Sequence, residues 1–190
     1  MSVPELIVLN KPYGVICQFS AHEKHPTLKQ YVSLPDVYPA GRLDTDSEGL
    51  LLLTANGRLQ AKIAHPKYKL IKTYWAQVEG KPDNERMQQL ADGVNLGDFI
   101  TQPAQVQLVN AADRARLWPR VPPIRERKTV TDFWLQIRIS EGKNRQVRRM
   151  CAKVGWPCLR LVRVGIGQLD VFSLKLPLGK WQAVNPKDLS

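Results

Sequence analysis

The chain has 190 residues, of which 43% are hydrophobic and 24% are charged, a composition typical of an ordinary globular protein. Its 28 lysines and arginines exceed its 17 aspartates and glutamates, which leaves a formal net charge of +11. This excess favours a polyanionic partner. Nucleic acid fits better than an acidic membrane surface, because we find no basic helix with a large apolar face.

The three cysteines, Cys17, Cys151 and Cys158, form neither a metal-binding nor a redox spacing, which predicts reduced thiols in the cytoplasm. The first ten residues lack the basic segment of a secretory signal, and their apolar run at 6–9 is too short for a signal or a membrane span. We therefore expect a cytoplasmic protein without a leader or an anchor.

The first part of the chain contains two predicted strands and one predicted helix. Residues 6–9 predict a short buried strand that runs into a turn at NKPYG, and residues 50–54 predict a second buried strand. Asn56 is a suitable cap for a helix over residues 57–64, which Pro66 would stop.

The middle of the chain alternates between strands and helices. Residues 72–80 alternate like a strand that shows one face to solvent. A helix is predicted to begin at Asp83 and to end at Gly93. Two further strands are predicted at 105–109 and 133–139, the second with its apolar residues on one face.

Residues 111–132, between those two strands, contain three prolines in the run WPRVPPI and six cations. This composition predicts a long, mobile hairpin connection, which either is solvated without a partner or assists RNA binding. A helix over 144–154, strand segments at 159–164 and a last piece near Trp181 complete the chain. Because strands outnumber helices and mostly follow one another, we predict an α+β fold with a mixed, largely antiparallel sheet.

The least ordinary stretch is GRLDTDSEGLLLLTANG at 41–57, where three acids precede four leucines. Asp44 would occupy the first position of a calcium loop, but the twelfth position is Ala55 where a bidentate Glu is needed. The chain also lacks a complete phosphate-binding loop, a histidine pair at helical ligand spacing and a serine elbow. The acids are therefore either capping side chains of a polar loop or include a carboxylate that is held rigidly in a cleft.

A second unusual segment, residues 143–169, has seven cations and no acid. On the predicted helix, the apolar residues fall on one face, and the three arginines Arg145, Arg148 and Arg149 share the opposite face. Such a face is either solvated or suited to an RNA backbone or a buried carboxylate.

Four motifs occur in the order NKPYG, GRLDTDSEGLLLLTANG, KTYWAQVEG and EGKNRQVRRMCAKVG. Together they resemble those of the RsuA-type pseudouridine synthases, over nearly the whole chain. This resemblance implies an isomerase that converts a uridine of ribosomal RNA, here 23S (large-subunit) RNA, to pseudouridine by flipping the base. It implies no metal, nucleotide or other cofactor. It also implies a central sheet shared by two subdomains, with the active-site cleft between them.

The resemblance assigns roles to individual residues. Asp44 corresponds to the essential aspartate of the family, Tyr74 to the aromatic residue that stacks on the flipped base, and Arg148 to the arginine that pairs with the aspartate. Asp46 and Glu48 are then interpreted as loop-shaping or capping residues. Arg42 is expected to support the site, and the residues expected to bind RNA are Lys11, Lys72, Lys143, Arg145 and Arg149.

We expect a single catalytic domain over residues 1–190, with approximate subdomains 1–66 and 67–190 and no S4-type RNA-binding domain before NKPYG. The expected protein is a monomer. Two other classes stay open: a non-catalytic ribosome-associated RNA-binding protein would have no use for a rigid aspartate, and a nucleic-acid glycosylase would have to admit water beside it.

Overall fold

The computed structural model describes residues 2–190, which divide into two compact units. Unit 1 consists of Met1–Leu70 and Arg163–Ser190, and unit 2 consists of Ile71–Val162. We expected a boundary at residue 66 and a second subdomain that continues to the C-terminus. Residues 163–190 instead return to unit 1, where the last strand pairs with the first one.

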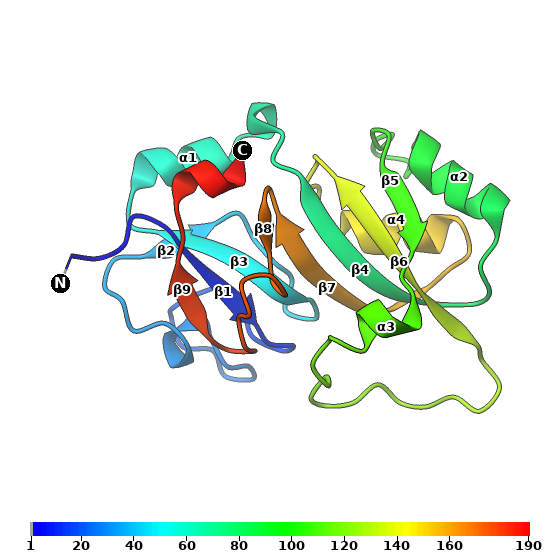
Figure 1. Cartoon of the computed structure of the whole chain (residues 1–190), viewed down its shortest axis with the longest axis horizontal. Coiled ribbons are helices and arrows are strands. Elements are labelled where there is room, and N and C mark those ends of the chain that lie inside the picture. The colour runs from blue at the N-terminus through cyan, green and yellow to red at the C-terminus, as the bar shows by residue number, and fades with distance from the viewer. Residues whose placement is uncertain (1) are drawn as a thin grey trace. The chain divides into compact units, whose positions relative to one another are not determined.

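Unit 1 is built on the strands β1 (Ile7–Lys11) and β3 (Glu48–Thr54), which pair antiparallel from Ile7 opposite Leu53 to Lys11 opposite Gly49. All residues of both strands are buried. β9 (Trp181–Ala183) pairs with the other edge of β1, and the two strands lie side by side in Figure 1. The remaining elements of this unit are β2 (Tyr38–Ala40), β8 (Leu169–Asp170), the helix α1 (Gly57–Ala64) and the 3-10 helices η1 (Leu28–Gln30), η2 (Pro66–Tyr68) and η3 (Pro186–Leu189).

Unit 2 is built on β4 (Lys72–Glu79) and β6 (Asp132–Ile139), which pair antiparallel along their whole length. β5 (Gln105–Leu108) pairs with the other edge of β6, and α2 (Asn84–Asp92) lies beside β5 (Figure 1). The unit also contains the short helix α3 (Ala111–Arg114) and the helix α4 (Gln146–Lys153). β7 (Cys158–Ile166) begins in unit 2 and ends in unit 1.

The strands form one nine-stranded sheet in the order β5-β6-β4-β7-β3-β1-β9, with β2 on β3 and β8 on β7. The registers of β1, β2, β5, β6, β8 and β9 with their neighbours are antiparallel. The predicted α+β fold with a largely antiparallel sheet is therefore confirmed. Among residues 2–190, no helix has both the length and the apolar run that a membrane span requires.

The helix boundaries follow local chemistry. The Asn56 side chain accepts hydrogen bonds from the backbone N–H groups of Arg58 and Leu59, at 3.0 and 3.1 Å, and so begins α1 as predicted. The Asp83 side chain caps α2 in the same way, and Gly93, with φ of 103°, ends it. A Cβ atom at Gly93 would lie 2.4 Å from the carbonyl oxygen of Thr101, so a larger residue would not fit there.

The helix α4 begins two residues later than predicted. Arg145 has a φ of 52°, in the left-handed region that does not continue an α-helix, and it is the residue before the first turn. Arg145 therefore does not share a helix face with Arg148 and Arg149. The predicted apolar stripe is buried as expected, and its members are Val147, Met150, Cys151 and Val154.

Candidate active site

The acidic stretch forms a loop over residues 41–47 in unit 1 that leads directly into β3. Gly49, the second residue of that strand, has a φ of 104°, and a Cβ atom there would lie 2.2 Å from the carbonyl oxygen of Arg163. A glycine is thus required both by the backbone conformation and by the close approach of β7. This contact fixes the end of the loop against the sheet.

Four successive backbone carbonyl oxygens of the loop, from residue 42 to residue 45, accept hydrogen bonds. Their donors come from four different places in unit 1: the Arg163 Nη1 to Arg42 at 3.3 Å, the Cys17 Sγ to Leu43 at 3.0 Å, the Ser47 N–H to Asp44 at 3.0 Å and the Gly14 N–H to Thr45 at 2.8 Å. Asp44, at the centre of this set, is half-buried, and Arg42 is exposed. The Asp44 side chain therefore extends from a backbone whose carbonyl oxygens accept hydrogen bonds both before and after residue 44.

Lys11 lies beneath the same loop and is fully buried. Its Nζ donates hydrogen bonds to the carbonyl oxygens of Pro12 and Val15, both at 2.9 Å, and of Thr45 at 3.5 Å. Burial lowers the pKa of Lys11 from 10.5 to about 8, against the opposing effect of the nearby acidic groups of Cys17, Glu48 and Asp46.

The expectation that Lys11 binds RNA is therefore wrong. Its ammonium group has no exposed surface, because the NKPYG turn folds back over it and uses it as a donor for main-chain oxygens. Lys11 is a structural cation that connects this turn to the loop of Asp44.

Two further charged side chains are buried beside Lys11. Glu48 is 1% exposed, and Arg163 is 6% exposed and donates from Nε to the carbonyl oxygen of Leu50 at 2.8 Å. Sequence reasoning counted Arg163 only as one of seven cations and missed its position under the loop. A signal was present, since Arg163 lies within the apolar run LRLVRVGI, where an exposed cation is not expected.

In unit 2, Tyr74 lies on β4 opposite Ile137 of β6 and is 9% exposed. Two residues earlier on the same face, the Lys72 Nζ donates to the carbonyl oxygens of Ser140 and Glu141, at 3.3 and 3.1 Å. Lys72 is half-buried and holds the chain where it leaves β6.

The same turn is connected to α4. The Gln146 Nε2, in the first residue of the helix, donates to the Glu141 Oε2 at 2.7 Å, and its Oε1 accepts from the Lys143 N–H at 3.2 Å. Glu141 also accepts from the backbone N–H of Gln102 at 3.0 Å. These bonds fix the start of α4 relative to Lys72 and hence to the strand that carries Tyr74.

The cations on and before α4 differ in their surroundings. Arg148 is half-buried. Burial raises the pKa of the Cys151 thiol well above its usual value, and the positive charge of Arg148 partly opposes this rise. Arg149 forms an ion pair with Asp98 and lies 5.5 Å from the centre of the Phe99 ring. Lys143 lies over the same ring at 5.6 Å, and Arg145 is exposed.

The segment 143–169 contains no acid, but Asp98 comes to Arg149 from 51 residues earlier in the chain. The Arg149 Nη1 lies 3.2 Å from one carboxylate oxygen, and hydrogen bonding to Arg149 lowers the pKa of Asp98. Arg149 therefore has a carboxylate partner within its own unit.

The structure thus brings Asp44, Arg42 and Lys11 together in unit 1. In unit 2 it connects the strand of Tyr74 and Lys72 to the helix of Arg148 and Arg149. Within the described part of the chain, residues 2–190, no group of three or more His, Cys, Asp and Glu side chains could hold a metal ion.

Comparisons with known proteins agree with this arrangement of motifs. Residues 5–153 match the family described as RNA pseudouridylate synthase. The protein "Ribosomal large subunit pseudouridine synthase E" of Xanthomonas axonopodis pv. citri is 57% identical over 164 residues, which cover 85% of each chain. Its namesake in Xanthomonas campestris pv. campestris is 54% identical over 179 residues, which cover 93% of this chain and 94% of the relative.

Among solved structures, one described as "Crystal structure of pseudouridylate synthase" has a TM-score of 0.78 at 26% sequence identity. The similarity covers 100% of this chain and 74% of that one. The likeness therefore extends over both units of the fold.

Proposed function

Since the chain belongs to the RNA pseudouridylate synthase family, we propose that it isomerises a specific uridine of large-subunit (23S) ribosomal RNA, with Asp44 as the catalytic residue. The relatives named for large-subunit RNA support the substrate. The role of Asp44 is supported by the loop of residues 41–47, in which each backbone carbonyl oxygen from Arg42 to Thr45 accepts a hydrogen bond. A carboxylate on a fixed backbone loses little conformational freedom when it meets the substrate.

The reaction breaks the bond from N1 of uracil to C1′ of the ribose, turns the base and forms a bond from C5 to C1′. N1 takes up a proton, and C5 releases its hydrogen to water, so the product has the mass of the substrate. No electron is transferred to or from the RNA. The role of Asp44 is to present its carboxylate to the reacting nucleotide, where charge changes during cleavage of the glycosidic bond.

The target uridine has to leave its stack, which costs a few kcal/mol. We propose that Tyr74 supplies the replacement surface, since base–aromatic stacking contributes about 1 to 3 kcal/mol per base. We assign Arg148 as the cation that stabilises the Asp44 carboxylate, and Arg42 as a support of the same loop. Substitution of Arg148 by Leu should then lower kcat severely, and substitution of Tyr74 by Ala, but not by Phe, should weaken binding of the flipped base.

The test follows the hydrogen at C5. Unmodified large-subunit RNA labelled with tritium at uracil C5 is incubated with the purified protein, both as naked RNA and in ribosomal precursor particles. We expect about one tritium released per pseudouridine formed, without any added cofactor.

Each alternative has a different product. A glycosylase would free uracil with its tritium in place and leave an abasic ribose that breaks under mild amine treatment. A non-catalytic RNA-binding protein would bind the RNA and release no label. Absence of release from both substrates would contradict the proposed function.

A further inference from the structure

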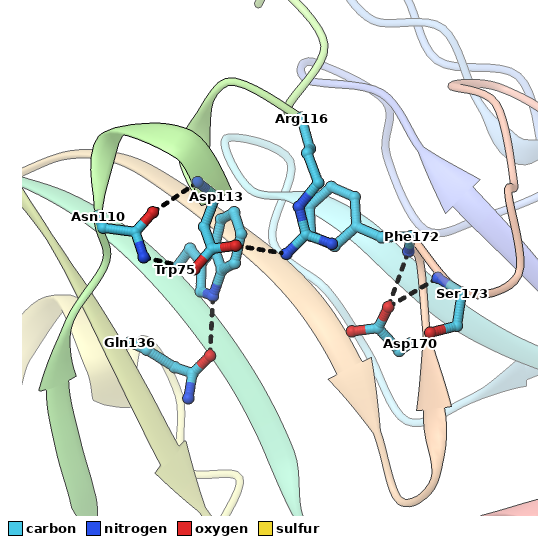
Figure 2. A network of polar contacts seen from close by, with 8 residues as sticks. All are labelled: Trp75, Asn110, Asp113, Arg116, Gln136, Asp170, Phe172 and Ser173. Atoms are coloured by element: carbon cyan, nitrogen blue, oxygen red, sulfur yellow. Dashed lines mark hydrogen bonds and ion pairs between the residues drawn. The ribbon is translucent and has the colours of Figure 1, made fainter.

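Residues 111–131, which connect β5 to β6, begin on the sheet of unit 2. The Trp75 Nε1 donates to the Gln136 Oε1 at 3.0 Å, and the Arg116 guanidinium lies 6.0 Å from the centre of the Trp75 ring (Figure 2). The Asp113 carboxylate accepts from Arg116 at 3.0 Å and from the Asn110 side chain at 2.9 Å. These contacts attach the start of the segment to β4.

A second attachment follows two residues later. The Arg160 Nη2 donates to the carbonyl oxygen of Trp118 at 2.9 Å, and its guanidinium lies 5.9 Å from the centre of the Trp134 ring. Arg160 is 8% exposed. It is therefore a cation of the fold that binds the backbone of the segment to β7 and β6.

The end of the segment is attached to β4 as well. The Arg127 Nη1 lies 2.5 Å from the Glu79 Oε1. Gly80 and Thr131 exchange two hydrogen bonds, from the Gly80 N–H to the Thr131 carbonyl at 2.8 Å and from the Thr131 Oγ1 to the Gly80 carbonyl at 3.0 Å. Residues 119–126 thus form an arch between two fixed points.

A pocket of about 550 Å³ lies under this arch, within the range of roughly 300 to 1,000 Å³ that is typical of ligand sites. Its charged lining consists of four cations, Arg120, Arg125, Arg127 and Lys128, and three acids, Glu79, Glu126 and Asp132. Glu79 pairs with Arg127, and the Arg120 Nε donates to the carbonyl oxygen of Pro122 at 2.8 Å. Arg125 and Lys128 are exposed, and neither forms an ion pair within the described chain from residue 2 to residue 190.

We propose that this pocket binds a nucleotide of the RNA substrate other than the isomerised uridine. An RNA nucleotide offers a singly charged phosphodiester, which Arg125 and Lys128 can bind. It also offers hydrogen-bond donors on the 2′-OH and the base amino groups, which Glu126 and Asp132 can accept. A pocket with mixed charges fits this combination better than it fits a free, multiply charged phosphate.

The proposal rests on the proposed function, because the partner is the RNA that this function requires. It also divides the cations of the segment into two groups. Arg116 and Arg127 hold the segment on the sheet, whereas Arg125 and Lys128 face the RNA. The two groups should therefore respond differently to substitution.

The experiment measures the salt dependence of RNA binding, using fragments of in vitro transcribed large-subunit RNA. All proteins carry Asp44→Asn, so that affinity is measured without turnover. Each of Arg125→Ala and Lys128→Ala should reduce the slope of log K against log salt concentration by roughly 0.7 to 0.9. The matched control is Arg114→Ala, which removes the same charge from an exposed position on α3 outside the pocket and should leave the slope unchanged.

Unchanged slopes for both pocket variants would overturn the proposal, and so would an equal reduction by Arg114→Ala. Thermal unfolding of each variant has to match that of the parent protein, because Arg125 and Lys128 are exposed and form no ion pair among residues 2–190. Single-stranded DNA copies of the bound fragments should bind more weakly than the RNA, and Glu126→Gln should reduce this preference. DNA that binds as well as RNA would contradict the assignment of the acids.

The two proposals can fail separately. If the wild-type protein releases no tritium, the proposed function fails while the binding slopes still test the pocket. If tritium is released normally and the slopes of the pocket variants stay unchanged, only the pocket assignment fails.

Discussion

The two loops that matter most in this chain are held in opposite ways. The loop of residues 41–47 is short, and four successive backbone carbonyl oxygens in it accept hydrogen bonds, three from other parts of unit 1 and one from Ser47 of the loop itself. The segment of residues 111–131 is long and is attached near its ends, mainly through side chains, with an arch between the attachments. The first loop fixes one carboxylate, whereas the second carries several cations over a pocket.

This difference indicates what each loop is suited for. A reacting group requires a narrow range of positions, and hydrogen bonds to successive backbone carbonyl oxygens provide it. Contacts to a flexible polyanion tolerate a wider range of positions, because a cation attracts a phosphate from several directions. The short loop should therefore be intolerant of substitution and the long one tolerant.

The largest effect is expected at the centre of the short loop. Asp44→Asn keeps the shape of the side chain and removes its charge, so kcat should fall by more than roughly 100-fold, while RNA affinity should stay within a few-fold of wild type. Tritium release and RNA binding by the same preparation check both parts. A variant that keeps a tenth of the wild-type turnover would refute the assignment.

The next largest effect is expected on stability, at the end of the same loop. Gly49→Ala places a Cβ atom 2.2 Å from the Arg163 carbonyl oxygen at a φ of 104°, which should cost roughly 3 kcal/mol or more in the free energy of unfolding. The matched control is Gly57→Ala at the start of α1, where a Cβ meets nothing within 4 Å and stability should change by less than about 1 kcal/mol. Equal urea midpoints for the two variants would show that the strand contact is not tight.

Burial of Lys11 under the loop should make the free energy of unfolding depend on pH. Because the pKa of Lys11 is about 8 in the folded protein and 10.5 when exposed, the unfolded chain binds more protons between these values. Stability contributed by Lys11 is therefore lowest below about pH 8 and rises by on the order of 3 kcal/mol as the pH approaches 10.5.

This rise is measured as the difference between the unfolding free energies of wild type and Lys11→Met, which removes the effects of other titrating groups. At pH 7 the variant should be less stable by roughly 2 kcal/mol, since the Pro12 and Val15 carbonyls lose their donor. A difference that is independent of pH from 7 to 10.5 would mean that Lys11 is not buried as described.

The smallest effect is expected in the long segment. Arg127 and Glu79 form an ion pair whose side chains are 57% and 19% exposed, so Arg127→Ala should change the free energy of unfolding by less than about 1 kcal/mol. Glu79→Gln and the double variant complete a cycle that isolates the pair. A coupling free energy of about 3 kcal/mol between Arg127 and Glu79 would contradict this, because the long segment would then be fixed as firmly as the short loop.

Local chemistry made much of the fold predictable. The caps Asn56 and Asp83 and the terminating Gly93 act on their immediate neighbours, and the apolar stripe of α4 follows from the helical period. The motif containing Asp44 could also be recognised from the sequence, because its three acids directly precede an apolar strand in a basic chain.

What could not be predicted depends on contacts between distant residues. Lys11 reads as one more cation until Thr45, 34 positions later, folds over it. Arg149 stands in an acid-free segment, yet its carboxylate partner is Asp98. Likewise nothing local to residues 163–190 indicates that β9 would pair with β1.

The pairing of β9 with β1 has a consequence for biosynthesis. Unit 1 is made of the first and the last segments of the chain, and unit 2 is inserted between them. At a translation rate of about 5 to 20 residues per second, the ribosome needs on the order of ten seconds to add the residues after Leu70. During that interval β1, whose residues are all buried in the finished protein, has one edge without its strand partner, and unit 2 is completed at Val162 before β9 is made. The order of synthesis thus favours folding of the inserted unit before the unit that carries Asp44.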